Sequence, residues 1–454
     1  MDNYIPQDPV ARVTVMEALF DALKAGNETP LPVLIRYYES GLWLSDYTLD
    51  EQGGFPAGLK RGVLSQDGLW NLLNDHPKRS MDMIHEKSRT WAEIDTSALI
   101  HNFQVAKLCS GKKIMCVIKG DAHGHGAVMC GKVLEAQGAD AFAVACLAEG
   151  ITLRKSGSKL PILILGYTDP EQVPQLLEYD LEQSVFDPDY AVRLNRAADG
   201  KTLGIHIKLD TGMSRTGIFA QHDPVAAART VMEIHALENL KIKGIFTHCA
   251  AADMPEKDDF TRLQISNYKA VLSELEKLGF AEDVVHHAGN SAVILNHPEA
   301  HFDMVRMGVM MYGFYPDGIY RPDGPLRQIL TLKTRVAQVK TLPEGALVSY
   351  GCTYRTGKET TIAIVAAGYA DSYPRALSNR GGYAVINGQK CPQIGRICMD
   401  MCMFDVTGVE VSQGDEVILY GQGGMSLDEI AALTGSINCE MTCLLTNRVP
   451  KIYL

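Results

Sequence analysis

The stretch that decides the fold runs from residue 114 to residue 126 and reads Ile-Met-Cys-Val-Ile-Lys-Gly-Asp-Ala-His-Gly-His-Gly. Its first five residues are apolar and partly β-branched, which predicts a buried strand of a parallel sheet. Lys119 closes this strand and enters a glycine-rich turn, the position at which α/β barrels carry their chemistry. A lysine there could simply extend its amine to water. If it is desolvated, it could instead serve as a Schiff-base amine.

The same pattern of apolar strand, polar turn and helix recurs along residues 89–327. The intervals of about 20 to 40 residues leave room for crossover helices such as 127–136 and 266–277. Eight parallel strands with helical returns predict a TIM-type (β/α)8 barrel. A doubly wound open sheet is the alternative, although no strand is followed by GxGxxG. The expected strands are 114–119, 141–146, 161–165, 183–186, 204–209, 241–248, 284–290 and 304–309.

The two ends of the chain have a different character. Residues 328–454 carry short runs of Val, Ile and Thr between glycine-rich turns, which predict a mostly antiparallel β C-terminal domain. Residues 1–80 predict a small helical N-terminal domain, and residues 81–88 a polar linker. The expected helices are 13–23, ending near Gly26, then 33–44 and one beginning at Ser65; the expected C-terminal strands are 329–339, 346–349, 360–366, 383–386 and 416–419.

Composition narrows the class of protein. The net charge is −11, and no basic stretch is long enough to form a groove, so nucleic acid is not an expected partner. No apolar run is long enough to span a bilayer, and the amino terminus lacks a secretion pattern, so we expect a cytoplasmic protein without a membrane partner. Most of the eleven cysteines fall in apolar runs and predict buried thiols, and no CxxC pair supports a metal site. The cysteines expected to be buried include Cys116, Cys146, Cys249, Cys398 and Cys402.

Chemically able residues gather at the expected strand ends. In the run 205–210, a period of two puts His206, Lys208 and Asp210 on one face, so Lys208 points into the barrel. A lysine paired with Asp210 in a polar barrel layer is the structural alternative. Arg215 follows Lys208 by seven residues.

The last three barrel strands supply further polar groups. His248 ends one strand, where it could be a hydrogen-bonded core histidine. Asn290 and Ser291 open a helix, which suits a phosphate but also an ordinary N-cap. Arg306 lies in an otherwise apolar strand and needs an acceptor, because an unpaired buried guanidinium is costly.

Six segments resemble one family. VIKGDAHGHG around Lys119 is similar to the pyridoxal-phosphate lysine motif of the alanine racemases, and LDTGMSRTG around Lys208 and Arg215 is similar to another of their motifs. The resemblance continues through four blocks in order and covers residues 89–454. Those blocks are Ser349-Tyr350-Gly351, residues 368–375, Gly395-Arg396-Ile397-Cys398-Met399-Asp400, and residues 437–450.

The resemblance implies roles for the barrel residues. Lys119 would carry pyridoxal 5'-phosphate as a Schiff base, and His248 would lie against the pyridine ring. Arg306 would hold the pyridine nitrogen, and Lys208, as a carbamate, would hold Arg215 against the phenolic oxygen. An arginine at the nitrogen leaves it unprotonated, which favours racemisation over transamination. His123, Asn290, Ser291, Gly308, Val309 and Asn447 would complete cofactor binding.

The resemblance also implies roles for the C-terminal domain. Tyr350 would be the second catalytic base, acting on the opposite face of the α-carbon from Lys119. Tyr369, Met399, Asp400 and Asn447 would bind or support the substrate. Two subunits would pair head to tail, so that Tyr350 of one serves Lys119 of the other.

Two positions depart from the family pattern. His123 and Asn447 stand where tyrosines usually reach the phosphate. Histidine can still donate to a phosphate, and an asparagine at position 447 is found in serine racemases related to vancomycin resistance.

The expected function is therefore pyridoxal-phosphate-dependent racemisation of alanine, and of serine as well, supplying D-amino acids for cell-wall peptidoglycan. A decarboxylase of the same architecture is an alternative, but it would need an acidic residue where Arg306 stands. A non-catalytic cofactor carrier is another, but it would resemble the barrel alone. Residues 59–67 resemble a small bacterial domain of unknown function and carry no activity over.

Overall fold

The computed structural model describes residues 5–25, 30, 33–34, 37, 42–56, 58–64, 88–319 and 321–454. The chain divides into two compact units, Met1–Ser88 and Arg89–Leu454. None of the helices in these described ranges combines the length and the apolar character that a membrane span requires.

The first unit is a small helical domain. Helix α1 (Pro9–Lys24) starts at the N-cap Asp8, whose side chain accepts the Ala11 N–H, and it ends at Lys24, two residues before the expected Gly26. Its buried face packs on a small core of its own. The described remainder comprises α3 (Leu42–Glu51) and the 3-10 turn η1 (Gly62–Leu64). The expected helix from Ser65, the linker 81–87 and part of the expected helix 33–44 lie outside the described residues.

A buried ion pair holds this helical unit together. Arg12 donates from Nε and Nη2 to the two carboxylate oxygens of Asp46, at 2.7 and 2.6 Å. Tyr37 also donates to Asp46, at 2.8 Å. The hydrogen bond that Arg12 donates to Asp46 raises the pKa of Arg12, so the guanidinium stays charged inside the domain.

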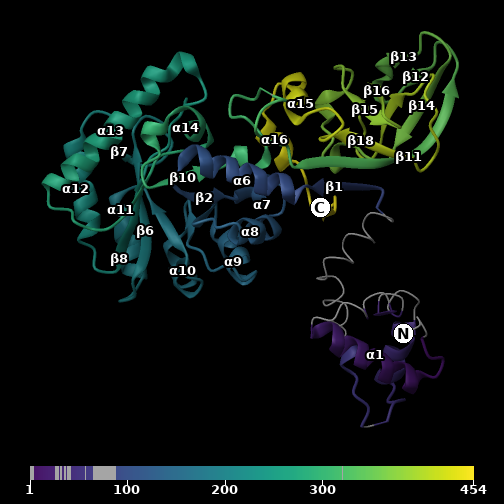
Figure 1. Ribbon diagram of the computed structural model, residues 1–454, viewed down its shortest axis with the longest axis horizontal. Coiled ribbons are helices and arrows are strands. Elements are labelled where there is room, and N and C mark those ends of the chain that lie inside the picture. The colour runs from purple at the N-terminus through teal and green to yellow at the C-terminus, as the bar shows by residue number, and fades with distance from the viewer. Residues whose placement is uncertain are drawn as a thin grey trace. The chain divides into compact units, whose positions relative to one another are not determined.

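The second unit contains the expected barrel. Its eight strands are parallel, in the order β10-β2-β3-β4-β5-β6-β8-β9, and the helices surround them (Figure 1). The ring closes between β9 and β10, where the Arg306 N–H donates to the Gly289 carbonyl at 2.7 Å. The strands are β2 (Lys113–Val117), β3 (Ala141–Val144), β4 (Ile162–Ile164), β5 (Glu182–Val185), β6 (Leu203–Asp210), β8 (Leu240–Phe246), β9 (Val285–His287) and β10 (Met304–Met307), with the short β7 (Ile218–Phe219) paired to β6.

Side-chain alternation explains why these runs build a barrel. Met115 and Val117 point inward to a small interior cluster, whereas Ile114, Cys116 and Ile118 pack outward on the surrounding helices. The helices are α6 (Thr96–Ser110), α7 (Lys119–His123), α8 (Ala127–Ala136), α9 (Leu147–Lys155), α10 (Val173–Glu178), α11 (Pro188–Ala197), α12 (Pro224–His235), α13 (Asp258–Lys277) and α14 (Ser291–Asn296), with 3-10 turns η2 (Pro170–Gln172), η3 (Pro255–Lys257), η4 (Pro298–Ala300) and η5 (Val309–Tyr312).

The C-terminal β-domain is mostly antiparallel, as expected. Six strands close on themselves in the order β14-β17-β16-β15-β18-β11, because β11 also pairs with β14. The strands are β11 (Leu330–Leu342), β12 (Leu347–Val348), β13 (Tyr354–Arg355), β14 (Thr360–Val365), β15 (Tyr383–Ile386), β16 (Gln389–Ile394), β17 (Cys402–Asp405), β18 (Glu416–Tyr420) and β19 (Lys451–Tyr453), with helices α15 (Leu427–Thr434) and α16 (Asn438–Cys443) and turns η6 (Tyr350–Cys352), η7 (Tyr369–Asp371) and η8 (Arg375–Leu377).

One strand of this domain comes from the other end of the second unit. Strand β1 (Thr90–Ile94) pairs antiparallel with β11 and parallel with β19, and only then does the chain enter the barrel at α6 (Figure 1). The sequence pattern did not predict β1, β19, α15 or α16. Of the five cysteines expected to be buried, Cys146 is exposed and Cys398 is half-buried, whereas Cys116, Cys249 and Cys402 are buried.

Candidate functional site

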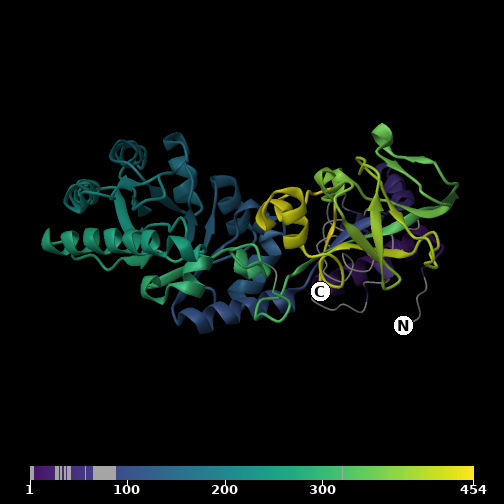
Figure 2. The same cartoon turned by 90° about the horizontal axis from the view of Figure 1, so that it is seen from above.

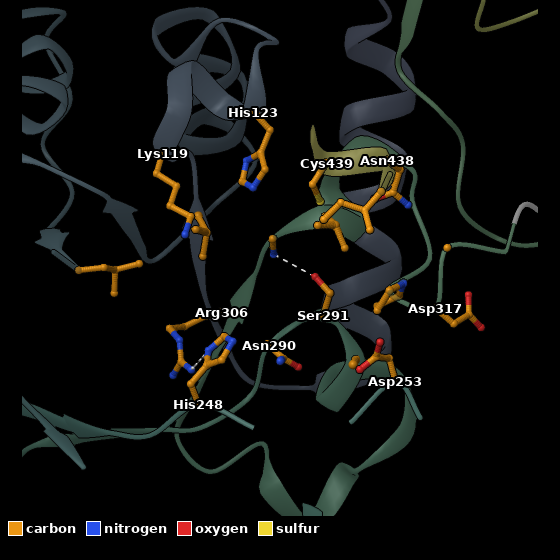
Figure 3. Close-up of a pocket in the computed structure, with 18 of the residues that line it drawn as sticks. Lys119, His123, His248, Asp253, Asn290, Ser291, Arg306, Asp317, Asn438 and Cys439 are labelled. Atoms are coloured by element: carbon orange, nitrogen blue, oxygen red, sulfur yellow. Dashed lines mark hydrogen bonds between the residues drawn. The ribbon is translucent and has the colours of Figure 1, made fainter. Parts of the chain in front are cut away.

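A cavity of about 880 Å³ opens at the carboxyl ends of the barrel strands (Figure 3). Polar side chains from five strand ends converge on it, which is the arrangement typical of an active site in this architecture. Ten of the candidate residues from the sequence line it: Lys119, His123, Lys208, Arg215, His248, Asn290, Ser291, Arg306, Gly308 and Val309.

Lys119 begins α7, two residues after β2 ends. Its amine makes no hydrogen bond or ion pair with any residue that the structure describes. Burial, and next the positive charge of Arg215, lower the pKa of this amine. A primary amine that is biased toward its neutral form can act as a nucleophile or a base.

The turn after Lys119 is left-handed. Gly120, Asp121, Ala122 and His123 all have φ between 52° and 62°, and three of them are not glycine. Such residues cost about 1–2 kcal/mol each in this conformation. The turn is held by the Asp121 carboxylate, which accepts the Ala127 N–H at 2.8 Å and pairs with Lys451 at 3.1 Å.

This left-handed turn directs His123 toward the cavity (Figure 3). The His123 ring lies 4.9 Å from the ring of Tyr312, and its Nδ1 is buried without a hydrogen-bond partner among the described residues. Burial, and then the charge of Lys119, lower the pKa of His123 to about 4. His125 stacks on the other side of the site against Tyr312 at 4.3 Å and does not line the cavity.

Lys208 and Arg215 form a cationic wall of the cavity. Lys208 points into the barrel, as the period of two predicted, and donates to the Thr216 hydroxyl at 2.6 Å. The alternative of an ion pair between Lys208 and Asp210 is not seen, because the Asp210 carboxylate accepts the backbone N–H groups of Gly212 and Ser214. Burial and the nearby Arg215 lower the pKa of Lys208 to about 8.

Asn290 and Ser291 lie where β9 turns into α14. Asn290 caps the helix by accepting the Val293 N–H at 3.0 Å. The Ser291 hydroxyl oxygen accepts the N–H groups of Gly308 at 3.1 Å and Met310 at 3.4 Å (Figure 3). Since both of these contacts use the oxygen as acceptor, the hydroxyl proton remains free to be donated into the cavity.

Arg306 is buried and lies beside His248 (Figure 3). Burial lowers the pKa of its guanidinium to about 10, so it stays charged at neutral pH. None of its hydrogen bonds to described residues uses Nε. Its acceptors within the protein are the carbonyls of Thr247 (2.6 Å), His287 (2.8 Å) and Ala288 (3.1 Å), with His287 Nδ1 at 2.9 Å and His248 Nδ1 at 3.3 Å.

Several residues that line the cavity were not predicted from the sequence. Thr216 and the groups at the outer end of the cavity, which come from helices α15 and α16 and from nearby loops, had no strand-end signal to identify them. Those groups include Asp253, Asp317, Asp428, Asn438 and Cys439. Asp428 accepts hydrogen bonds from Asn438 and Gln328, both at 2.7 Å.

The candidate residues of the β-domain do not line the cavity. Tyr350 is 71 % exposed, and the hairpin of β12 and β13 that carries it lies at the end of the β-domain remote from the barrel (Figures 1 and 2). Asn447 is also exposed and makes no hydrogen bond that uses its side chain with the described residues.

The segments around Tyr350 nevertheless form one surface, here called the β-domain face: Leu347, Tyr350, Tyr369, Met399 and Met401. The Ser349 hydroxyl donates to the Arg396 carbonyl at 2.6 Å, and the Tyr369 N–H donates to the Cys398 carbonyl at 3.0 Å. These contacts bring the three segments together. Asp400 follows Met399 and pairs with Arg448.

Comparisons with known proteins agree on one family. Residues 94–316 match the model described as "Alanine racemase, N-terminal domain", and residues 329–453 match "Alanine racemase, C-terminal domain". Residues 8–86 match a domain of unknown function, DUF4298.

Individual relatives cover the same part of the chain. An alanine racemase of Carboxydothermus hydrogenoformans is 44 % identical over 375 residues, covering 80 % of this chain and 99 % of the relative. One of Clostridium tetani is 39 % identical, covering 80 % of this chain and 95 % of the relative. A solved alanine racemase of Clostridium difficile superposes with a TM-score of 0.76 at 36 % identity, covering 81 % of this chain and 96 % of that one.

Proposed function

Because this chain belongs to the alanine racemase family, we propose that it interconverts L- and D-alanine with pyridoxal 5'-phosphate held in the barrel cavity. The observation that carries the proposal is that one cavity brings together the desolvated amine of Lys119, which has no partner among the described residues, the hydroxyl of Ser291 and the charged Arg306.

The residues present fit that cofactor. The hydroxyl proton of Ser291 and the unpartnered ring of His123 are donors suited to a phosphate group. Arg306 presents an unused Nε–H, which suits the lone pair of a pyridine nitrogen. Lys119 offers the amine that joins to an aldehyde.

When bound, pyridoxal phosphate supplies an electrophilic carbon and a ring that accepts electron density from the substrate's α-carbon. The protein supplies the proton transfers. We propose that Lys119 Nζ removes the α-proton of one enantiomer and that Tyr350 Oη returns a proton on the opposite face; the two exchange roles in reverse. Arg306 keeps its own protons, so it holds the ring nitrogen without protonating it.

The exposed Tyr350 supports a site shared between two subunits. A catalytic tyrosine that is 71 % exposed and remote from the barrel cannot meet Lys119 of its own chain. Its neighbours on the β-domain face are also apolar and exposed, Met399 at 51 % and Tyr369 at 42 %, which is typical of a surface that a partner covers. We therefore propose a head-to-tail homodimer in which the β-domain face of each subunit closes the cavity of the other.

We propose that Lys208 is carbamylated. An amine whose pKa is about 8 keeps a minority of neutral molecules near physiological pH, far more than an ordinary lysine does, and this neutral form can react with carbon dioxide. The resulting anion would replace the repulsion between Lys208 and Arg215 with an attraction.

We also propose a cytoplasmic location, because all eleven cysteines are free thiols, as expected in a reducing compartment.

Two assays test the proposal. Chiral chromatography should detect D-alanine when the protein and cofactor are given L-alanine, and failure of interconversion in either direction would refute racemisation. Mixing inactive Lys119→Ala and Tyr350→Phe chains tests the dimer, because half of randomly reassorted dimers would be mixed and each would hold one intact site. About a quarter of wild-type activity should return. No recovery after proven subunit exchange would place both residues in one chain.

A further inference from the structure

A line of hydrogen bonds crosses the barrel interior from Arg306 to the carboxylate of Glu182. Arg306 Nη1 lies 2.9 Å from His287 Nδ1, and His287 Nε2 lies 2.9 Å from His206 Nδ1. His206 Nε2 in turn lies 2.9 Å from Glu182 Oε2. Arg306, His287 and His206 are buried, and Glu182 is 19 % exposed.

The chemistry of arginine fixes every proton along this line. A guanidinium donates hydrogen bonds and accepts none, so His287 must present a bare Nδ1 to Arg306. A neutral His287 then carries its proton on Nε2 and donates it to Nδ1 of His206. His206 is left with a proton on Nε2, which it donates to Glu182.

The same contacts exclude the doubly protonated, positively charged form of either histidine. An imidazolium at His287 would point an N–H at the guanidinium, and one at His206 would point an N–H at the N–H of His287. Burial, followed by the charge of Arg306, lowers the pKa of His287 well below its usual value. Burial is the largest influence on Glu182 and raises its pKa, but the hydrogen bond from His206 and the nearby positive charges, Lys243 and Arg154 among them, together leave the pKa lowered.

The neighbouring strand β8 leaves space for this line of hydrogen bonds and packs an aromatic ring against it. His206 on β6 must pass β8 to reach His287 on β9, and its partner in the register on β8 is Gly244. A Cβ at position 244 would lie 2.6 Å from His206 Cε1, so only glycine leaves room for the imidazole. The Phe246 ring stacks on His287 at 4.9 Å and 4°, and the Arg306 guanidinium lies 5.3 Å from the same ring.

The two ends of the line lie at opposite ends of the barrel. Glu182 is the first residue of β5, at the amino ends of the strands, whereas Arg306 lines the cavity at the carboxyl ends. We propose that Glu182, His206 and His287 are positioning residues that hold Arg306 through a chain of hydrogen bonds running in one direction, with both histidines neutral and protonated on Nε2. This chain of hydrogen bonds rests on the proposed function only in one respect, the identity of the group that Arg306 would hold in the cavity.

Ring nitrogen NMR of the cofactor-free full chain, labelled with ¹⁵N-histidine, tests the proton order directly. We expect His206 and His287 each to show a protonated Nε2 and a bare Nδ1 at neutral pH. An imidazolium, or a proton on Nδ1 of either ring, would overturn the proposal. Because no cofactor or substrate is present, this result stands or falls independently of racemisation.

Variants test the consequence for the cavity. Glu182→Ala removes the terminal acceptor, and His206→Phe interrupts the chain; each should speed the release of bound pyridoxal phosphate roughly tenfold, as one lost charge-assisted hydrogen bond does. Glu182→Gln keeps an acceptor and should preserve both the proton order and the slow release. His286→Gln, a half-buried histidine on the same strand as His287, is the matched control.

The outcomes separate the proposals. Rapid release in Glu182→Ala with slow release in Glu182→Gln and His286→Gln supports the chain. Equal release rates in Glu182→Ala and wild type would overturn it, even if the wild-type protein racemises alanine normally.

Discussion

At the barrel mouth, Lys119, Lys208 and Arg306 lie in a cavity that lowers the pKa of all three groups, whereas Tyr350 on the β-domain face is 71 % exposed. The first region is assembled within one chain by strand ends that the barrel must bring together. The second has its residues in place but nothing opposite them. Under the proposed head-to-tail dimer, this difference means that a half-site can be complete in its sequence and its fold and still depend on a second surface to desolvate it.

Replacing Lys119 should have the largest effect on this comparison. Lys119→Ala removes the amine that we propose both attaches the cofactor and moves a proton, so activity should fall by at least about 10⁴-fold. Borohydride reduction of the wild-type protein with cofactor, followed by peptide mapping, should label Lys119. A label on Lys208 would show that Lys208, and not Lys119, carries the cofactor.

Replacing Tyr350 tests the other region. Tyr350→Phe should lower turnover by about 10²–10⁴-fold and should abolish proton removal from one enantiomer, because it removes one of two bases on opposite faces. Exchange of the α-proton with deuterium, measured separately for L- and D-alanine, distinguishes the directions. Equal and mild losses for the two enantiomers would make this tyrosine a structural residue.

The cost of desolvating cations at the barrel mouth can be measured through stability. The pKa of Lys208 is lowered to about 8 in the folded protein, so the unfolded chain binds more protons between that pH and about 10.5. Lys208 therefore destabilises the cofactor-free fold below about pH 8, and this cost disappears as the pH rises toward 10.5. Lys208→Met should stabilise the second unit by about 1–3 kcal/mol at pH 7.

Urea unfolding at pH 7 and pH 10 measures that gain, with the exposed Lys241→Met as a control. A gain that persists at high pH would show that methionine packs better, not that charge is costly. Carbon-dioxide-free buffer should be used, because a carbamate on Lys208 would remove the cation.

A smaller effect is expected at Asn447, an exposed residue of the β-domain. We propose that serine is a second substrate, since asparagine offers a donor and an acceptor to a β-hydroxyl where tyrosine would crowd it. Asn447→Tyr should lower the serine-to-alanine ratio of kcat/KM by roughly ten- to thirty-fold, the size of one hydrogen bond. An unchanged ratio, or a wild-type protein that never racemises serine, would contradict this proposal.

The smallest effect should come from removing residues 1–80. Every residue of the barrel mouth and of the β-domain face lies in the second unit, so kcat/KM should stay within about twofold of the full chain. Sedimentation and cofactor titration of the soluble truncated protein are the measurements. Loss of dimers or of cofactor would make the first unit part of the catalytic assembly.

The sequence predicted the barrel well because its strands are local signals. All eight expected strands are present within a few residues of their predicted bounds, since each is an apolar run with its own turn. Strand β1 was missed because its partners, β11 and β19, lie some 240 and 360 residues further along the chain. No local pattern encodes such a pairing.

The candidate site was predicted unevenly for the same reason. Strand-end residues such as Lys119 and Ser291 could be identified because a parallel barrel gathers all its carboxyl ends. The acceptors of Arg306 could not, because Thr247, His287 and Ala288 meet it only through barrel closure. Nor could the need for glycine at position 244 be predicted, because it depends on the His206 imidazole that passes this position in the folded barrel.

The left-handed turn at residues 120–123 has a consequence for directed evolution. Glycine at position 122 would relieve backbone strain of about 1–2 kcal/mol, so selection for heat tolerance should favour Ala122→Gly. The same change would let the segment that carries Lys119 and His123 sample other conformations. Heat-selected lineages should therefore lose turnover as they gain melting temperature, and lineages selected for turnover should keep the strained alanine.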